Sequence, residues 1–324
     1  MFHVVLALLP IAGFSIWQYG LSALTLIVTV TLACIASERL FNRMAGQPST
    51  LSDWSASITG LLLALTLPPS FPLWMGAVAG FIGIALGKAL FGGIGFNVFN
   101  PALVGRAFVQ AAFPVAITAW VPAFAPKRFS EFIPTTFTTP MMTPPDIVAW
   151  SKQALDGFTG ATPLARWKFE NVLANPVDFL TGSITASAGE TSAILILVCG
   201  LYLALRKFMD WRIPVAVLGS AALLALAFHL FNPGRYPDPA FVLLSGGLMI
   251  GAVFMATDMA TSPVTPKGVW IYGTLIGMLT VIIRYFGGLT EGVMYAILIG
   301  NALTPIIDQL TQPRVLGAQR TKQA

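Results

Sequence analysis

The stretch that decides the fold is Phe2–Ser37, FHVVLALLPIAGFSIWQYGLSALTLIVTVTLACIAS, which contains no Asp, Glu, Lys or Arg. A membrane-spanning helix needs about 20 mostly apolar residues. Gly20 divides the stretch into two runs of nearly that length, Phe2–Tyr19 and Leu21–Ser37. We therefore predict two successive transmembrane helices. The first run lacks a basic flank and continues into a second span, so it is not expected to be a cleaved signal peptide.

The composition of the whole chain agrees with the prediction of transmembrane helices. Of the 324 residues, 56% are hydrophobic and only 10% are charged, whereas soluble domains carry about 25% charged residues. So few charges cannot cover a surface that faces water, and we predict an all-α integral membrane protein. The net charge of +5 is then expected to set membrane orientation rather than to attract nucleic acid, which is not an expected partner.

Eight further hydrophobic runs bring the predicted number of transmembrane helices to about ten. They cover approximately Trp54–Leu67, Leu73–Phe91, Pro101–Trp120, Thr191–Phe208, Ile213–Phe231, Ala240–Thr257, Val269–Phe286 and Gly292–Leu310. The sequence therefore predicts four regions. These are a first five-span unit (1–120), a long extracytoplasmic loop that carries the functional site (121–190), a second five-span unit (191–310) and a cytoplasmic tail (311–324).

The distribution of basic residues predicts the orientation, because short cytoplasmic loops are enriched in Lys and Arg. With a cytoplasmic N-terminus, Arg235 and Arg284 lie in short outer loops and Arg106 is ambiguous. Ten others lie at cytoplasmic ends: Arg39, Arg43, Lys88, Arg206, Lys207, Arg212, Lys267, Arg314, Arg320 and Lys322. Long loops escape the rule. We therefore expect both termini inside and the 121–190 loop outside.

A weak internal repeat connects the two five-span units. Phe91-Gly92-Gly93 precedes Asn100-Pro101-Ala102, and Phe286-Gly287-Gly288 precedes Asn301-Ala302. Because five is odd, two such units enter the membrane from opposite sides, as in transporters with inverted repeats. The alternative is that Gly and Asn simply gather at span ends.

Two points in these units are predicted helix interruptions, Asn100-Pro101 and Thr257-Asp258. Non-helical backbone at membrane depth must be buried in protein or line a cavity. Asp258 is therefore a candidate for a role in binding an ion or a cofactor. It could equally lie at the cytoplasmic mouth with no such role, and the sequence leaves both possibilities open.

The long loop contains the segment Asp156-Gly157-Phe158-Thr159-Gly160-Ala161-Thr162-Pro163-Leu164-Ala165. The Thr162 hydroxyl can be esterified, and the small residues before it allow close approach to the backbone. Pro163 favours an extended conformation at Thr162, so we expect its side chain to point outward and to be exposed. The alternative for this segment is a turn followed by a helix cap.

Asp156 to Thr162 form D-x-x-T-G-A-T, which resembles the flavinylation motif of a membrane-protein family. The family comprises the D subunit of the Rnf electron-transport complex and the related B subunit of the sodium-pumping NADH:quinone reductase. Three other blocks resemble the family in the same order: Gly92–Phe108, Ala256–Gly268, and Glu291–Asn301 with Asp308. Thr159 departs from the serine of many relatives. The chain begins almost directly at its first span, so the Rnf D subunit is the closer likeness.

The resemblance implies FMN joined through its phosphate to Thr162, with Asp156, Thr159, Gly160 and Ala161 in recognition or local contacts. It implies a duplicated five-helix unit and a second, noncovalent flavin such as riboflavin. The expected function is electron transfer within a ferredoxin/NAD oxidoreductase complex that translocates sodium or protons. Expected partners are the A, B, C, E and G subunits of the Rnf complex and a flavin transferase, in a bacterial or archaeal cell membrane.

Other chemistry finds little support in the sequence. Cys34 and Cys199 lie in hydrophobic runs without a C-x-x-C pattern, so neither a metal site nor a disulfide is expected. Gly92-Gly93-Ile94-Gly95 lies between spans and does not make a dinucleotide fingerprint. NADH and ferredoxin are therefore expected to react on partner proteins of the complex, with no catalytic residue in this chain. The alternative function is an inverted-repeat ion or small-solute transporter without a redox cofactor.

Overall fold

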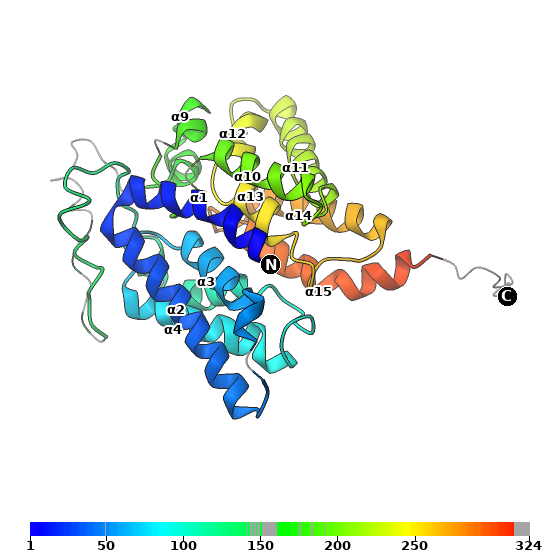
Figure 1. The fold of residues 1–324 in the computed structure, drawn as a ribbon. Helices are drawn as coiled ribbons and strands as arrows, with labels where there is room; N and C mark the ends of the chain where they lie inside the picture. Colours follow the sequence, from blue (N-terminus) through cyan, green and yellow to red (C-terminus); the bar gives the residue numbers. More distant parts are fainter. Residues whose placement is uncertain are drawn as a thin grey trace, which may run out of the picture.

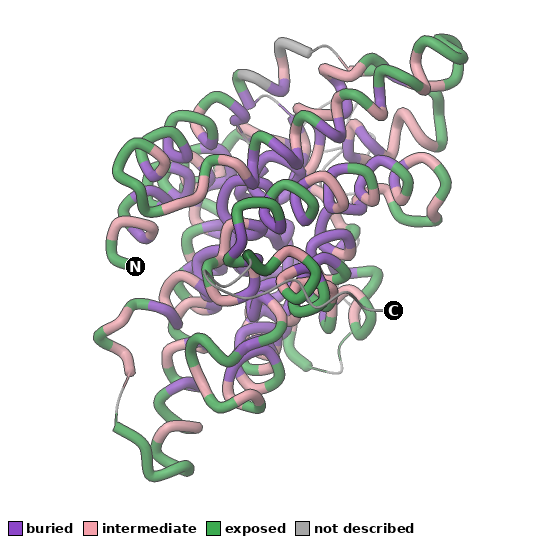
Figure 2. Tube along the Cα trace, turned by 90° about the vertical axis from the view of Figure 1, so that its right-hand side faces the viewer, coloured by how far each residue is buried: buried purple, intermediate pink, exposed green. Residues whose placement is uncertain are grey.

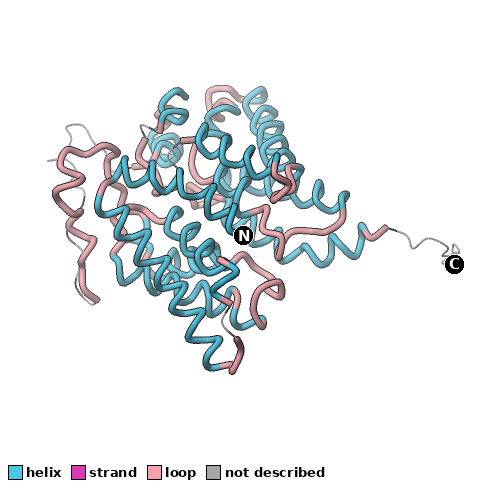
Figure 3. Tube along the Cα trace, viewed as in Figure 1, coloured by secondary structure: helices cyan, strands magenta, loops and turns pink. Residues whose placement is uncertain are grey.

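The computed structural model describes residues 1–48, 50–140, 142, 145, 147, 150, 161–174, 176–182, 184–190 and 192–313. Within these residues the chain forms helices and loops and no strand (Figures 1 and 3). The elements are α1 Phe2–Tyr19, α2 Leu21–Met44, η1 Leu51–Asp53, α3 Ser55–Thr66, α4 Leu73–Gly87, η2 Ala89–Phe91, α5 Pro101–Ala112, α6 Pro114–Ile117, α8 Pro163–Ala165, η3 Arg166–Glu170, α9 Pro176–Thr181, α10 Ala193–Leu205, α11 Arg212–Phe231, α12 Pro239–Leu244, α13 Leu248–Ile250, η4 Gly251–Met255, α14 Pro266–Phe286 and α15 Val293–Thr311.

Among the described residues, six helices are long and apolar enough to cross a membrane: α1, α2, α4 with η2, α11, α14 and α15. The all-helical membrane fold predicted from composition is therefore confirmed. Two further apolar helices are shorter, α3 with 12 residues and α10 with 13. The predicted third and sixth runs correspond to these two.

Three expected boundaries were wrong. The second run was expected to end at Ser37, but α2 continues to Met44, because Glu38 turns into the protein and pairs with Lys88. The fifth run ends early because Pro114 follows the end of α5 and starts the short helix α6. The eighth run, expected to be continuous, breaks after α12, where Ser245 is extended and Gly246 has φ +64°.

Small residues bring the long helices close together, as is common in membrane proteins. On α4, Gly76 and Gly80 face α2; a Cβ on Gly80 would lie 3.1 Å from Cys34 Sγ. On α14, Gly273 and Gly277 face α11 in the same four-residue spacing, and a Cβ on Gly273 would lie 2.6 Å from Ala216 Cβ. The α2–α4 and α11–α14 pairs are thus built alike.

The buried residues of both halves form one continuous core, which runs along the centre of the molecule in Figure 2. The polar segment after α6 lies at the end of the molecule where α1 ends and α2 begins (Figure 1). There the Tyr19 hydroxyl donates to the Ala186 carbonyl (3.1 Å), and Leu21 N–H donates to the Arg128 carbonyl (3.0 Å). The described parts of the 121–190 region are therefore packed onto the ends of the helices.

Candidate functional site

Thr162 begins the short helix α8. Its backbone is extended, with φ −71° and ψ 158°, as the following proline predicts. Its hydroxyl oxygen accepts a hydrogen bond from Ala165 N–H at 3.2 Å, which satisfies one of the free donors at a helix start. The chain then continues into a π-helical turn, η3. Thr162 is therefore a helix cap, while the turn expected before it lies outside the described residues.

The expectation that the Thr162 side chain is exposed was wrong, because only 6% of the residue is exposed. The cause lies in the residues that follow. Leu164 is buried in a small cluster with Phe179, Ile184 and Phe241. Trp167 packs against the same Phe241 ring, with centroids 6.3 Å apart. These apolar contacts pull α8 and η3 onto α12 and cover the threonine.

Lys168 fixes this segment to the end of α14. Its ammonium donates to three backbone carbonyls, those of Arg284 (2.9 Å), Gly287 (2.5 Å) and Leu289 (2.8 Å). Carbonyls at a helix C-terminus lack partners within the helix and attract cations. Lys168 therefore acts as the C-terminal cap of α14 and ties the Thr162 segment to the second half.

Of the other residues in the predicted flavin motif, Asp156, Thr159 and Gly160 lie outside the described residues. Ala161 is described and half-buried. Thr162 has the hydroxyl group that a phosphoester requires. Among the described residues, this hydroxyl accepts a hydrogen bond from Ala165 N–H. Its burial means that a phosphate donor can reach this oxygen only when α8 has not yet packed or has opened.

The two predicted helix interruptions meet at a cavity. Asn100 caps the start of α5, and its side-chain NH₂ donates to the Met255 carbonyl (3.3 Å) at the end of the π-helical turn η4. The space beside them has a volume of about 310 Å³ and is bordered by Asn97, Asn100, Thr257 and Asp258. Asp258 also caps the turn that follows it, accepting from Ala260 N–H (3.3 Å). The sequence predicted that each break is buried in protein or lines a cavity; the structure places both on the wall of the same cavity.

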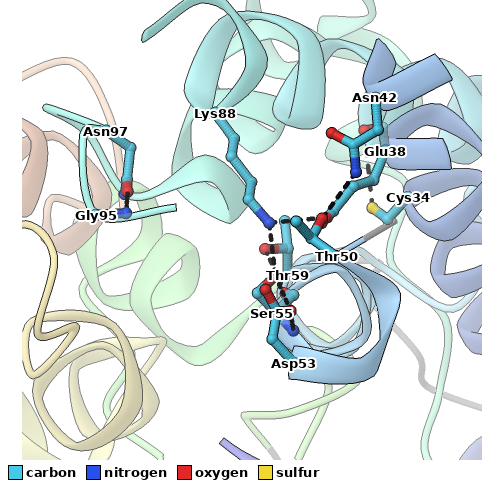
Figure 4. Close-up of polar contacts among 11 residues, drawn as sticks. Cys34, Glu38, Asn42, Thr50, Asp53, Ser55, Thr59, Lys88, Gly95 and Asn97 are labelled. Atoms are coloured by element: carbon cyan, nitrogen blue, oxygen red, sulfur yellow. Dashed lines mark hydrogen bonds and ion pairs between the residues drawn. The ribbon is translucent and has the colours of Figure 1, made fainter. Parts of the chain in front are cut away.

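A chain of polar groups reaches this cavity from the end of α2 (Figure 4). The Lys88 ammonium lies 2.8 Å from Glu38 Oε2 and donates to Ser55 Oγ at 2.5 Å. Glu38 also accepts from the Thr50 hydroxyl. Lys88 and Ser55 line the cavity, and both ends of the ion pair are buried. The cost of burying such a pair is offset only where further hydrogen bonds satisfy its remaining donors and lone pairs.

Comparison with known proteins decides the family. The family model described as the NQR2, RnfD, RnfE family matches residues 1–317. The chain belongs to this family.

Named members of the family resemble the chain over nearly its whole length. The D subunit of the proton-translocating ferredoxin:NAD(+) oxidoreductase complex of Clostridium ljungdahlii is 41% identical over 320 residues, covering 99% of this chain and 92% of the relative. The D subunit of the Na(+)-translocating ferredoxin:NAD(+) oxidoreductase complex of Acetobacterium woodii is 37% identical, covering 99% and 91%. The D subunit of the ion-translocating oxidoreductase complex of Halorhodospira halophila is 37% identical with the same coverage.

Sequence reasoning missed several residues that the family fold brings together. Lys88 was placed at a cytoplasmic end without its partner Glu38, and Arg106 was left ambiguous. The break at Ser245-Gly246-Gly247 was also missed, although a Ser-Gly-Gly run inside an apolar stretch is a turn signal. The sequence signal for the buried ion pairs is weak. A charged residue next to a hydrophobic run indicates that an ion pair is possible, but it does not identify the partner residue.

Proposed function

We propose that this chain is the D-type membrane component of an Rnf-type ferredoxin/NAD oxidoreductase complex that translocates sodium or protons. The observation that carries the proposal is the match to three D-type relatives over 99% of the chain. Their names differ in the ion, proton in one and sodium in another, so the ion stays open. The partners on this proposal are the A, B, C, E and G subunits of the complex.

The finer part of the proposal is that Thr162 carries FMN through a phosphoester bond. It is supported by the seven-residue motif that ends at Thr162 and by the position of Thr162, in extended conformation, at the start of α8. In this bond the Thr162 Oγ1 replaces the leaving group of an activated flavin phosphate and loses its proton. When bound, FMN supplies one-electron transfer.

The chain's own residues then hold the flavin segment in place. Leu164 and Trp167 anchor α8 and η3 on α12, and Lys168 fixes them to the end of α14. Because Thr162 is buried once this segment is packed, the flavin transferase must act before packing or on an opened segment. Asp156, Thr159, Gly160 and Ala161 serve that recognition in the proposal.

The test compares two threonine N-caps in the full chain, expressed with the rest of the complex and a flavin transferase. Thr162→Ala is expected to abolish covalent flavin, seen as lost fluorescence of the denatured band and lost FMN mass on the peptide. Thr162→Ser keeps a hydroxyl and is expected to retain part of the label. Thr265→Ala is the matched control, since Thr265 caps α14 through Gly268 N–H (3.1 Å) and should keep full label.

Both alanine variants lose a cap that contributes about 1 kcal/mol, so they should be expressed and inserted alike. A Thr162→Ala band that still fluoresces contradicts the covalent site. A wild-type peptide without FMN mass, in the presence of the transferase, favours the alternative function of a transporter without a redox cofactor.

We propose the cavity at the helix breaks as the site of the second, noncovalent flavin. The cavity volume of about 310 Å³ lies at the lower end of the roughly 300–1,000 Å³ of ligand pockets, which are mostly apolar with a few polar groups. Asn97 and Lys88 on its wall can donate hydrogen bonds to ring oxygens. Thr162→Ala protein should therefore still release flavin on denaturation, and Asn97→Leu should reduce that amount.

We also propose ten spans in two inverted repeats, with both termini inside and the Thr162 loop outside. The paired glycine spacings on α4 and α14 support the repeat. The orientation is consistent with the basic-residue count. Single cysteines at the exposed positions Lys127 and Lys207, in a chain lacking Cys34 and Cys199, test it. An impermeant thiol reagent should label Lys127→Cys in intact cells and leave Lys207→Cys unlabelled; the reverse result contradicts the orientation.

A further inference from the structure

Four charged residues from distant parts of the chain meet in the protein interior, and none of their side chains has a role in the proposed function. They are Arg106 on α5, Glu190 just before α10, Arg284 near the end of α14 and Glu291 just before α15. Arg106 and Glu190 are each 6% exposed and Arg284 is 1% exposed. Buried charges of this kind need partners or a change of protonation.

The two carboxylates are paired unequally. One guanidinium nitrogen of Arg106 lies 2.5 Å from Glu291 Oε2, but the other lies 3.8 Å from Glu190 Oε1, beyond hydrogen-bond distance. Arg284 directs its terminal nitrogens to the carbonyls of Val242 (2.6 Å) and Ser245 (3.0 Å). Neither oxygen of Glu190 makes a hydrogen bond of good geometry within the described parts of the chain, and the Ser187 hydroxyl is the nearby group that can donate to it.

Glu190 is held where two helices of the fold end. The residues before it pair with the end of α3, through Ala188 N–H to the Leu67 carbonyl (3.1 Å) and Gly189 N–H to the Leu65 carbonyl (2.6 Å). Its carboxylate lies against the break after α12, where a Cβ on Gly247 would be 2.7 Å from Glu190 Oε1. The backbone around the Glu190 side chain therefore leaves it little room to move toward Arg106.

The environment of Glu190 favours its neutral form. Burial raises the pKa of the Glu190 carboxyl to about 8, the charge of Glu291 adds to this, and Arg106 and Arg284 oppose it. The Ser187 hydroxyl also opposes the rise. The fourth titratable group that faces Glu190 is the Tyr19 hydroxyl at the end of α1. A carboxylic acid without hydrogen bonds costs far less to bury than a carboxylate.

We propose that Glu190 is a proton-binding site and that Arg106 changes its partners with the state of that site. When Glu190 holds a proton, Arg106 stays on Glu291 alone. When the proton leaves, the guanidinium shifts by about 1 Å, from 3.8 Å to the 2.7–2.9 Å of a charge-assisted hydrogen bond, and bridges both carboxylates. The ligand is a proton, exchanged with water, and the site does not require a flavin.

The site also adjoins the Thr162 segment. A Cβ on Gly246 would lie 2.6 Å from Leu164 Cδ1 and 3.2 Å from an Arg284 nitrogen, and Lys168 bonds to the Arg284 carbonyl. Gain or loss of the Glu190 proton thus changes the charge directly beneath the packed α8 segment.

The experiment is an infrared pH titration of the purified full-length chain in lipid discs. Wild type should show the C=O band of a buried carboxylic acid, which fades as pH rises with a midpoint near 8. Glu190→Gln should lack this band. Glu131→Gln is the control, because Glu131 is exposed and paired with Lys127 at the surface, and it should titrate like wild type.

A second variant keeps Glu190 and tests whether Arg106 changes its partners. Glu291→Gln removes the competing charge and frees Arg106, so the Glu190 midpoint should fall by at least about one pH unit. The proposal is overturned if wild type and Glu190→Gln give the same carboxyl bands at every pH. It is equally overturned if the midpoint rises in Glu291→Gln, or if sodium rather than protons removes the band at constant pH.

Discussion

Replacement of Lys168 by methionine is the most direct test of how the Thr162 segment is held. Methionine keeps most of the apolar stem and removes the ammonium that donates to the carbonyls of Arg284, Gly287 and Leu289. A hydrogen bond to a charged group contributes about 1.5–3 kcal/mol. Lys168 is half-buried, so water replaces part of each bond and the three are not additive. We expect a loss of about 2–4 kcal/mol, confined to the packing of α8 and η3.

This loss of packing free energy can be measured locally, as an increase in the population of molecules in which the segment is open. Because 1.4 kcal/mol is a factor of ten in an equilibrium constant, the open population of the segment should rise by roughly 30-fold or more. Hydrogen exchange followed by mass spectrometry reads this directly in peptides that cover 163–174. The helices α1 and α2 should exchange as in wild type, since Lys168 does not contact them in the hydrogen bonds described.

Lys127→Met is the matched control for this measurement. Lys127 lies in the same long loop, but its side chain is 70% exposed and, among the described residues, its ion pair is with Glu131, four residues on, at 3.0 Å. Surface pairs of this kind contribute about 0.3–0.5 kcal/mol. Equal rates of hydrogen exchange in 163–174 for both variants would refute the conclusion that Lys168 fixes this segment to α14.

Two further predictions concern the helix packing and the pH dependence. Gly277→Ala drives a Cβ into Ser220 Oγ and the Val217 carbonyl and should destabilise the α11–α14 pair by about 1–3 kcal/mol. Gly219→Ala, on α11 with open space around it, should instead be neutral or slightly stabilising, and melting temperatures in detergent compare the two; an equal effect would contradict the close packing. For Glu190 the pKa is raised in the folded state from 4.5 to about 8, so the native protein holds a proton that the unfolded chain releases between these values. Stability should therefore fall as pH rises from about 4.5 to 8, and the melting temperature of Glu190→Gln should lack this part of the fall.

The sequence determined the membrane class and most of the helices. Length and hydrophobicity are local properties, so runs such as Phe2–Tyr19 and Val269–Phe286 identified α1 and α14 to within a few residues. Pro163 likewise predicted the extended backbone at Thr162, because the clash that a proline imposes acts on its immediate neighbour. The break at Asn100 was visible because Pro101 follows it, and the break at Thr257-Asp258 because polar residues interrupt an apolar run.

Only the tertiary structure decided what those residues touch. The burial of Thr162 depends on Leu164 and Trp167 finding α12, far along the chain. Arg106 and Glu291 are 185 positions apart, and nothing in the sequence near Arg106 indicates that partner. In lipid a charge must be neutralised inside the protein. Which pairs form, and which carboxylate is left with only a distant arginine, depends on how the helices of both halves come together.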